Sequence, residues 1–132
     1  MNDATHHETF DSWLGAYGDA WEARDPRAAA ELFSADATYQ ETPFEEPARG
    51  REAIAQYWSR VTRGHQQVRF DHEVLAVTED MGIARWWASF DSVHLGARVE
   101  LDGIFVVRMG AEGMCKEFRE WWHYREHDPQ SG

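Results

Sequence analysis

Three glutamates lie close together in one short segment of the sequence, "ATYQETPFEEPARG" at residues 37–50. Glu41, Glu45 and Glu46 surround Phe44, and two prolines stiffen the segment. A carboxylate at the mouth of an apolar pocket can act as a general base on a bound molecule. Loop glutamates are also commonly solvated, so the residues alone leave both interpretations open.

Two further polar side chains occur in segments rich in apolar residues. Asp102 stands in the run "LDGIFVV", the most apolar strand-like segment of the chain. A carboxyl buried there without a charged partner would stay protonated, although a structural acid bonded to a nearby arginine or tryptophan fits equally well. His72 alternates with Phe70 and Val74, which fits either a proton shuttle or a core histidine.

Hydrophobic spacing predicts three helices in the first half of the chain. Thr5 opens a capping-box pattern, and apolar side chains then recur every three or four residues, which predicts a helix over about 6–24. Asp25 is a residue type that favours the N-cap of a helix, and the proline that follows it favours the first helical position. Together they predict the start of a second helix. This second helix is expected to stop near Ser34, and a third helical pattern covers about 51–62.

The second half of the chain has the pattern of strands separated by turns. Alternating apolar residues and glycine-containing turns follow a short strand at 37–40 and predict four long strands, at residues 67–78, 83–94, 98–109 and 114–124. Because helices come first and strands last, the expected fold class is α+β, with the helices on one face of an antiparallel sheet. We expect one domain over residues 1–132, with a core over about 6–125 and short flexible tails.

Both faces of the predicted sheet carry large aromatic side chains. Successive residues of a strand point to opposite faces, so Trp86 and Trp87 place one ring on each side, as do Trp121 and Trp122. The helices can cover only one of these faces. We therefore expect the outer face to be covered by a second copy of the chain in a homodimer.

Composition limits the partners of the chain. Its formal net charge is −11, and an acidic surface repels phosphate backbones and anionic lipid headgroups, so neither nucleic acid nor a membrane is expected as a partner. Cys115 is the single cysteine, which excludes an intrachain disulfide and a cysteine-based zinc site. No histidine spacing predicts a metal site. Because the sequence has no signal-peptide pattern and no apolar run of transmembrane length, we expect a cytoplasmic protein.

Several local phrases resemble a known superfamily of folds. They are "AWEARDPRAAAELFSADATY", "GREAIAQYW", "LDGIFVVRMGAEG" and "EFREWW". In order and spacing they are similar to the nuclear-transport-factor-2-like superfamily, which includes the SnoaL-like polyketide cyclases and the ketosteroid isomerases. The resemblance extends over about 10–124. It implies a cone, in which a strongly curved sheet wraps around the long first helix and leaves a deep apolar pocket at its open end.

The resemblance implies chemical roles for three residues. Aligned with the ketosteroid isomerases, Tyr17 lies at the position of their first-helix tyrosine, Glu41 at that of their base, and Asp102 at that of their late-strand acid. In such a site the base removes a proton next to a carbonyl group, and two neutral donors hold the resulting enolate oxygen. No cofactor is implied.

The pocket implied by the resemblance is expected to take a flat, mostly apolar ligand with a few polar oxygens, such as a polyketide- or steroid-like compound. Phe44 is expected to point inward, with Glu45 and Glu46 in water. Glu120 is included because its phrase "EFREWW" is similar to the closing strand of related epoxide hydrolases. The expected lining residues are Trp13, Tyr39, Phe44, Trp58, His72, Trp86, Phe105 and Glu120.

Cofactor-independent isomerase, cyclase or dehydratase chemistry on an apolar carbonyl compound is the leading hypothesis, with Glu41 as base. The alternative is a non-catalytic ligand-binding or protein-interaction module, because one fold can serve many functions. An epoxide hydrolase is a weaker alternative, since Glu100 stands where those enzymes carry an arginine.

Overall fold

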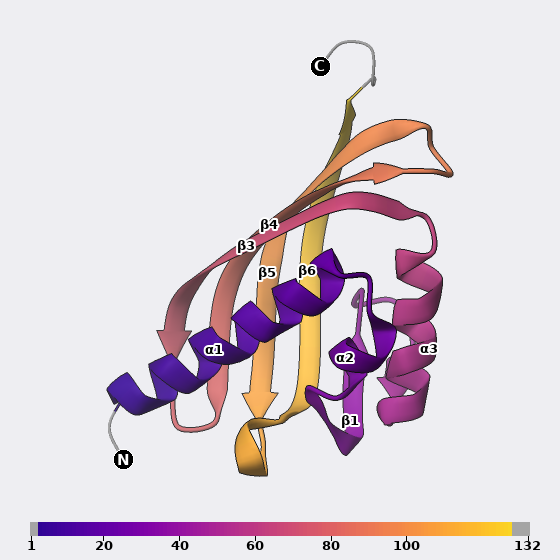
Figure 1. Ribbon diagram of the computed structural model, residues 1–132. Coiled ribbons are helices and arrows are strands. Elements are labelled where there is room, and N and C mark those ends of the chain that lie inside the picture. The colour runs from indigo at the N-terminus through magenta and orange to yellow at the C-terminus, as the bar shows by residue number, and fades with distance from the viewer. Residues whose placement is uncertain (1–2, 128–132) are drawn as a thin grey trace.

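The computed structural model describes residues 3–127 and consists of helices packed on one curved sheet (Figure 1). The helices are α1 (Asp3–Glu22), α2 (Pro26–Ala30) and α3 (Arg51–Thr62), with a short 3-10 turn η1 (Ala111–Gly113). The strands are β1 (Phe33–Gln40), β2 (Ala48–Arg49), β3 (His65–Val77), β4 (Met81–Ser92), β5 (Ala97–Met109) and β6 (Cys115–His127).

The six strands form a single sheet in the order β2-β1-β6-β5-β4-β3. The four long strands, β3 to β6, are an antiparallel meander, and β1 joins the free edge of β6 in parallel. Figure 1 shows α1 crossing one face of the long strands, while α2 and α3 lie near β1 at one end of the sheet. This arrangement confirms the predicted α+β fold and gives the sheet an inner face toward α1 and an outer face away from it.

Most predicted elements match the observed ones closely, because the hydrophobic periods in the sequence are long. The third helix has the predicted bounds, and Asp25 caps α2 as expected, since its side chain accepts a hydrogen bond from the backbone N–H of Ala28 at 3.1 Å. Two predictions were wrong. α1 begins at Asp3, so Thr5 lies within the helix rather than at its N-cap, and α2 ends at Ala30 because the chain already extends into β1. β6 continues to His127, so the first two residues of the tail predicted from about Glu126 belong to this strand. The rest of the predicted tail lies outside the described residues.

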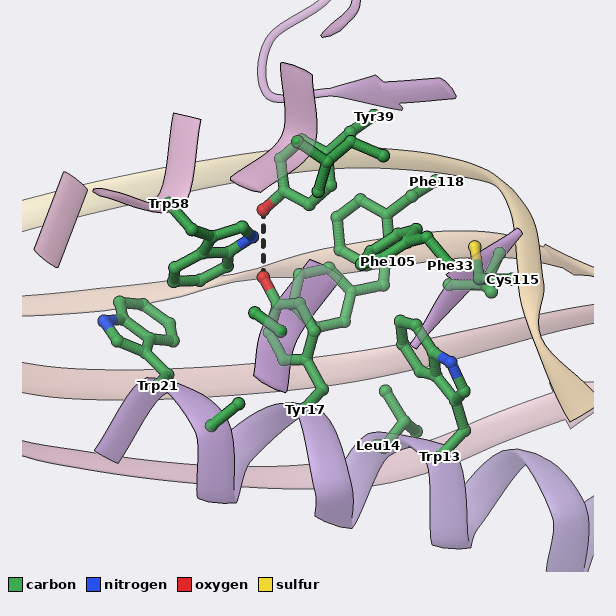
Figure 2. Close-up of a cluster of buried hydrophobic side chains, with 14 of the residues drawn as sticks. Trp13, Leu14, Tyr17, Trp21, Phe33, Tyr39, Trp58, Phe105, Cys115 and Phe118 are labelled. Carbon is green, nitrogen blue, oxygen red and sulfur yellow. Dashed lines mark hydrogen bonds between the residues drawn. The ribbon is translucent and has the colours of Figure 1, made fainter. Parts of the chain in front are cut away.

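Aromatic rings fill the space between α1 and the inner face of the sheet. Tyr17 lies at their centre and is 1% exposed; its ring stacks on that of Phe118 with centroids 5.5 Å apart and meets the edge of Trp58 at 5.4 Å. Figure 2 shows these rings converging from α1, α3, β1 and the long strands. Large rings from four parts of the chain therefore fix α1 and α3 against the sheet.

Inward and outward residues alternate along β4, β5 and β6, apart from one register shift near the start of β6. The register places Trp86, Gly103 and Trp122 in one inward row and Trp87, Asp102 and His123 in the neighbouring outward row. Trp86 is 2% exposed, whereas Trp87 is 37% exposed. The two faces therefore have different chemistry. No helix of the described residues is long and apolar enough to cross a membrane.

A glycine-to-alanine pair tests the close packing of this sheet. A Cβ on Gly103 would lie 2.2 Å from the backbone oxygen of Trp121 and 3.0 Å from the Cα of Trp122, so the β6 backbone would have to move. We expect Gly103→Ala to lower the free energy of unfolding by about 1–3 kcal/mol in urea titrations. The matched control is Gly15→Ala in α1, where nothing lies within 4 Å of the added Cβ. It should stabilise the protein by about 0.5–1 kcal/mol, and equal effects of both changes would contradict the packing.

Candidate functional site

A cavity of about 320 Å³ opens between α1, α3, the segment after β1 and the inner face of the sheet. Its wall is mostly aromatic. The residues that line it include Tyr17, Trp21, Tyr39, Glu41, Tyr57, Trp58, His65, Trp86, Glu120 and Trp122. None of the residues lining this cavity is a lysine or arginine.

Two tyrosine hydroxyls and a carboxyl form a hydrogen-bonded chain in the cavity wall. The hydroxyl oxygens of Tyr17 and Tyr39 are 2.9 Å apart, and the Tyr39 hydroxyl donates to Oε1 of Glu120 at 3.4 Å. Tyr17 comes from α1, Tyr39 from β1 and Glu120 from β6, so the fold joins groups far apart in the sequence. All three side chains are almost completely buried.

The Glu120 carboxyl is the more deeply buried of the two carboxyls in the cavity, and its pKa is strongly perturbed. Burial, above all, raises the pKa of Glu120 well above its ordinary range; the nearby Glu41 raises it further, and the hydrogen bond from Tyr39 partly opposes both effects. A carboxyl shifted in this direction keeps its proton to a higher pH than an ordinary glutamate, and the protonated form can donate to a bound molecule. The pKa values of Tyr17 and Tyr39 are also raised well above the ordinary range, mainly by burial, so both remain hydroxyls.

Glu41 lies in the same cavity but is only half-buried. Its backbone oxygen accepts a hydrogen bond from the indole Nε1–H of Trp122 at 3.2 Å, which fixes the loop against β6. Burial raises the pKa of the Glu41 carboxyl, as does the charge of Glu45, while a hydrogen bond from Tyr57 lowers it. Glu41 is thus the more exposed and more readily ionised of two carboxyls that share one cavity.

His65 supplies a neutral imidazole at another part of the cavity wall. The indole Nε1–H of Trp21 donates to Nδ1 of His65 at 3.2 Å, so Nδ1 carries no proton and the proton of the neutral ring lies on Nε2. Burial lowers the pKa of His65 to about 4, and the neighbouring His94 adds to this effect. The cavity therefore has no cationic side chain at neutral pH.

Two indole N–H groups in the cavity wall are buried without a hydrogen-bond partner. They belong to Trp58 and Trp86, each 2% exposed. Figure 2 shows the Trp58 nitrogen directed toward the paired hydroxyls of Tyr17 and Tyr39. Unpaired buried donors are uncommon and costly, and the Trp58 donor beside the hydroxyls makes this part of the cavity suited to an oxygen that gains negative charge.

The structure brings together six of the residues selected from the sequence. Tyr17, Glu41, Tyr39, Trp58, Trp86 and Glu120 all line the cavity. Sequence reasoning missed Tyr57 and His65 as lining residues. Tyr57 could have been predicted, because it is one of the apolar positions of the third helical pattern. His65 precedes the predicted start of the strand, and no pattern in the sequence indicates that it lines a cavity.

Asp102 lies outside the cavity, on the outer face of the sheet. Its carboxylate is paired with Arg85, at 3.2 Å to Nε and 2.6 Å to Nη2. Hydrogen bonding to Arg85 lowers the pKa of Asp102, and its side chain is 54% exposed. The prediction of a buried and protonated Asp102 is therefore wrong, because the apolar residues around it in sequence alternate between the two faces.

Four other predicted lining residues also lie away from the cavity. Phe44 is 99% exposed, so it does not tuck inward, whereas Glu45 and Glu46 are exposed as expected. Trp13 and Phe105 are core residues: the Trp13 indole donates to the backbone oxygen of Leu32 at 2.9 Å, and Phe105 stacks on Trp86. The imidazole Nε2 of His72 pairs with Oδ1 of Asp11 on α1 at 2.7 Å, which fixes it between helix and sheet.

The arrangement is chemically suited to proton transfer. It offers a half-exposed carboxylate, a buried carboxylic acid and neutral hydroxyl donors around one apolar space. Among the described residues, no group of three or more His, Cys, Asp and Glu side chains is placed to hold a metal ion.

Comparison with solved structures gives strong likeness in fold at low sequence identity. SalBIII, described as an epoxide hydrolase/cyclase-like enzyme in pyran ring formation in the polyether salinomycin, is 16% identical with a TM-score of 0.79, covering 92% of this chain and 98% of that one. A protein with a ketosteroid isomerase-like fold from Catenulispora acidiphila, in complex with trimethylamine, is 20% identical with a TM-score of 0.72, covering 83% of each chain. At these identities the likeness shows the fold alone.

Rv0760c of Mycobacterium tuberculosis has the same fold, with 13% identity and a TM-score of 0.76 over 87% of this chain and 93% of that one. No protein of curated function matches the sequence.

The family model of the SnoaL-like domain matches residues 14–118, which is most of the chain. The matched range includes the second half of α1, the cavity-lining segment after β1 and most of the sheet. The chain therefore belongs to the SnoaL-like domain family, within the nuclear-transport-factor-2-like superfamily.

Proposed function

We propose that this protein is a cofactor-independent enzyme that moves a proton on a small, mostly apolar carbonyl compound. Glu41 acts as the general base, and Glu120 acts as the acid that donates to the carbonyl oxygen. The observation that carries this proposal is the presence of two carboxyls in one aromatic cavity, one half-exposed and one fully buried against Tyr39. Pairs of titratable groups whose environments separate their pKa values are the usual basis of acid and base assignment.

The proposed reaction begins at a carbon next to the carbonyl group. Ionised Glu41 removes a proton from that carbon; the C–H electron pair becomes a carbon–carbon double bond, and negative charge moves to the carbonyl oxygen. Glu120 donates a hydrogen bond or its proton to that oxygen, and the hydroxyls of Tyr39 and Tyr17 support Glu120. Return of the proton from Glu41 to a different carbon re-forms the carbonyl group, any proton given to its oxygen goes back to Glu120, and the isomerisation is complete. In this scheme Glu120 is the carboxylic acid donor, the role that the resemblance to the ketosteroid isomerases implied for Asp102.

The charge of the cavity supports an uncharged substrate. Two carboxyls line it, no lysine or arginine does, and His65 is neutral, so a carboxylate or phosphate would be repelled there. The aromatic wall suits a flat ring or an unsaturated chain. These features support an isomerase, cyclase or dehydratase that acts on an unsaturated ketone, including polyketide- or steroid-like compounds.

Epoxide opening is a second candidate, which the same two carboxyls support. Protonated Glu120 would donate to the epoxide oxygen as the C–O bond breaks, while Glu41 would take the proton of the attacking hydroxyl or water. SalBIII, which has the same fold, is described as epoxide hydrolase/cyclase-like. We rank this candidate second because the related epoxide hydrolases carry an arginine where this chain has Glu100. The cavity offers no substitute, since no arginine lines it.

Substitution of the two glutamates tests the proposed roles. With a panel of β,γ-unsaturated ketones, isomerisation is followed by the absorbance of the conjugated product. We expect Glu41→Gln to lower kcat by about 10²–10⁴-fold, the usual contribution of a positioned base, and Glu120→Gln to lower it by a similar factor. Tyr17→Phe should have a smaller effect, because Tyr17 acts through Tyr39.

Asp102→Asn is the matched control, because Asp102 is a carboxyl of the same sheet that faces outward. Its kcat should stay within about twofold of wild type, as expected for a substitution outside the site. Unchanged turnover in both glutamate variants would rule out the proposal, as would an Asp102→Asn variant that is as impaired as they are. Ligand binding without turnover of any ketone or epoxide would instead favour a non-catalytic binding module.

The burial of Glu120 predicts a pH-dependent stability that needs no substrate. Since the folded pKa of Glu120 is raised above its unfolded value, the folded state binds the proton more tightly. Its contribution is most favourable below the unfolded pKa and is lost progressively as pH rises toward the folded pKa. Wild type should therefore lose stability relative to Glu120→Gln as the pH rises above the ordinary glutamate pKa of 4.5, measured by urea unfolding. The exposed loop variant Glu46→Gln should show no such divergence, and parallel curves for wild type and Glu120→Gln would contradict the burial.

A further inference from the structure

The cavity has a second polar end, which the proposed mechanism does not use. The row of the sheet that contains Glu120 crosses β4 at Ala84, whereas Ser92 lies at the far end of that strand. His65 on β3 is the direct partner of Ser92, and both residues line the cavity. Residues opposite each other on neighbouring strands point to the same face of a sheet, so these two side chains lie side by side. The cavity therefore has a carboxyl at one end and an imidazole with a hydroxyl at the other.

The imidazole of His65 is fixed by its neighbours, and one of its nitrogens is left over. Its Nδ1 accepts a hydrogen bond from Trp21 at 3.2 Å, and its ring stacks on that of Phe90 with centroids 3.7 Å apart. Its backbone oxygen accepts from the guanidinium of Arg24 at 3.1 Å. Within residues 3–127, no protein group pairs with Nε2, which carries the proton of the neutral ring. His65 is therefore a preorganised donor for an oxygen that enters the cavity.

The hydroxyl of Ser92 is the second donor at this end. Its oxygen accepts a hydrogen bond from the backbone N–H of Leu95 at 3.1 Å, within the turn that joins β4 and β5. A hydroxyl that accepts one bond in this way still has its own hydrogen to donate. Phe90, Val99 and Leu95 belong to the same lining and are apolar. A few fixed polar groups in an apolar wall are the usual means by which a pocket orients its ligand.

The two polar ends are separated by more than the width of one ring. Tyr17 and Trp21 lie one turn apart on α1, which is about 6 Å along the helix axis. Their ring centroids are 6.5 Å apart, and the centroids of Trp21 and His65 are a further 6.1 Å apart. The Tyr17 hydroxyl bonds to that of Tyr39, which donates to Glu120. A ligand that reaches both ends therefore contains several fused rings or an equally long flat chain.

We propose that His65 and Ser92 bind a second oxygen of the substrate, at the end opposite the carbonyl group that meets Glu120. The substrate class is then a flat, unsaturated ketone with a hydroxyl, ether or second carbonyl oxygen at its far end. An uncharged oxygen is favoured over a carboxylate, because burial lowers the pKa of His65 to about 4 and the ring is neutral at neutral pH.

The two polar ends together select one orientation of the substrate. A molecule with oxygens at both ends satisfies the donors of both ends in that orientation, and this decides which carbon lies next to Glu41. His65 and Ser92 are thus specificity-determining residues. The inference rests on the proposed function for the identity of the group that meets Glu120.

Binding of matched phenols tests this inference without any turnover. A phenol is a stable enol, so it stands in for the enol formed at Glu120. One pair is 2-naphthol and 6-methoxy-2-naphthol, and a longer pair is 17-deoxyestrone and estrone. The second member of each pair adds an acceptor oxygen at the far end. By isothermal titration calorimetry, we expect the added oxygen to tighten binding to wild type by about three- to tenfold in at least one pair.

Substitutions at the far end should remove this gain. His65→Phe keeps a ring against Phe90 but has no nitrogen, and it should abolish the gain. Ser92→Ala should reduce the gain by about two- to threefold. Because the gain compares two ligands on the same variant, a general effect on the fold cancels out of it. His123→Phe is the matched control, since His123 lies in an outward row of the sheet and does not line the cavity. It should keep the gain of wild type.

Three results would overturn the inference. They are phenols that fail to bind wild type, an added oxygen that gives no gain in either pair, and a gain that survives in both His65→Phe and Ser92→Ala. Failure of the proposed function gives a different result. A gain without turnover of any ketone would support the second oxygen site and count against the enzyme. Turnover that depends on Glu41 and Glu120 but comes without a gain would overturn this inference alone.

Discussion

Burial of the Glu120 carboxyl among aromatic rings is the constraint on which the rest of the site depends. A carboxylate in that position would lose its hydration without gaining a cation, because no lysine or arginine lines the cavity. The side chain is tolerated because it can keep its proton and because Tyr39 bonds to it. The hydroxyl pair of Tyr17 and Tyr39 thus has a structural reason as well as a chemical one. Tyr17 is held in turn by the ring stack that anchors α1 to the sheet.

The same constraint explains why the second carboxyl lies at the rim. Two ionised carboxylates inside a small apolar cavity would repel strongly, so one of them has to remain near water. Glu41 meets this condition because it follows β1 at the point where the chain leaves the sheet, and Trp122 bonds to its backbone. Glu45 and Glu46, a few residues further on, lie fully outside. The loop therefore contributes one carboxyl to the cavity and keeps the others in solvent.

Periodic features of the sequence predicted the fold well, because burial of long amphipathic segments determines their type. The third helix and the order of the four long strands follow from that pattern alone. Side-chain direction at the site was harder to predict. Phe44 was expected to turn inward because it is apolar, yet a loop position has no alternation that ties residue type to direction. His65 was missed because its role depends on Trp21, 44 residues away in sequence.

Asp102 and Glu120 show what decides the chemistry of an acid in such a sheet. Both are carboxyls on adjacent strands, and each has one apolar residue next to it in sequence, Leu101 for Asp102 and Trp121 for Glu120. Glu120 shares a row with the inward Phe105, whereas Asp102 shares a row with the outward Trp87. A shift of one residue along a strand therefore separates an acid whose pKa is raised by burial from one whose pKa is lowered by Arg85. An apolar run predicts that a strand is buried on both faces, but only the covering elements decide which face excludes water. Here α1 and α3 cover the inner face, and for that reason Glu120 rather than Asp102 lies in the cavity with its pKa raised by burial.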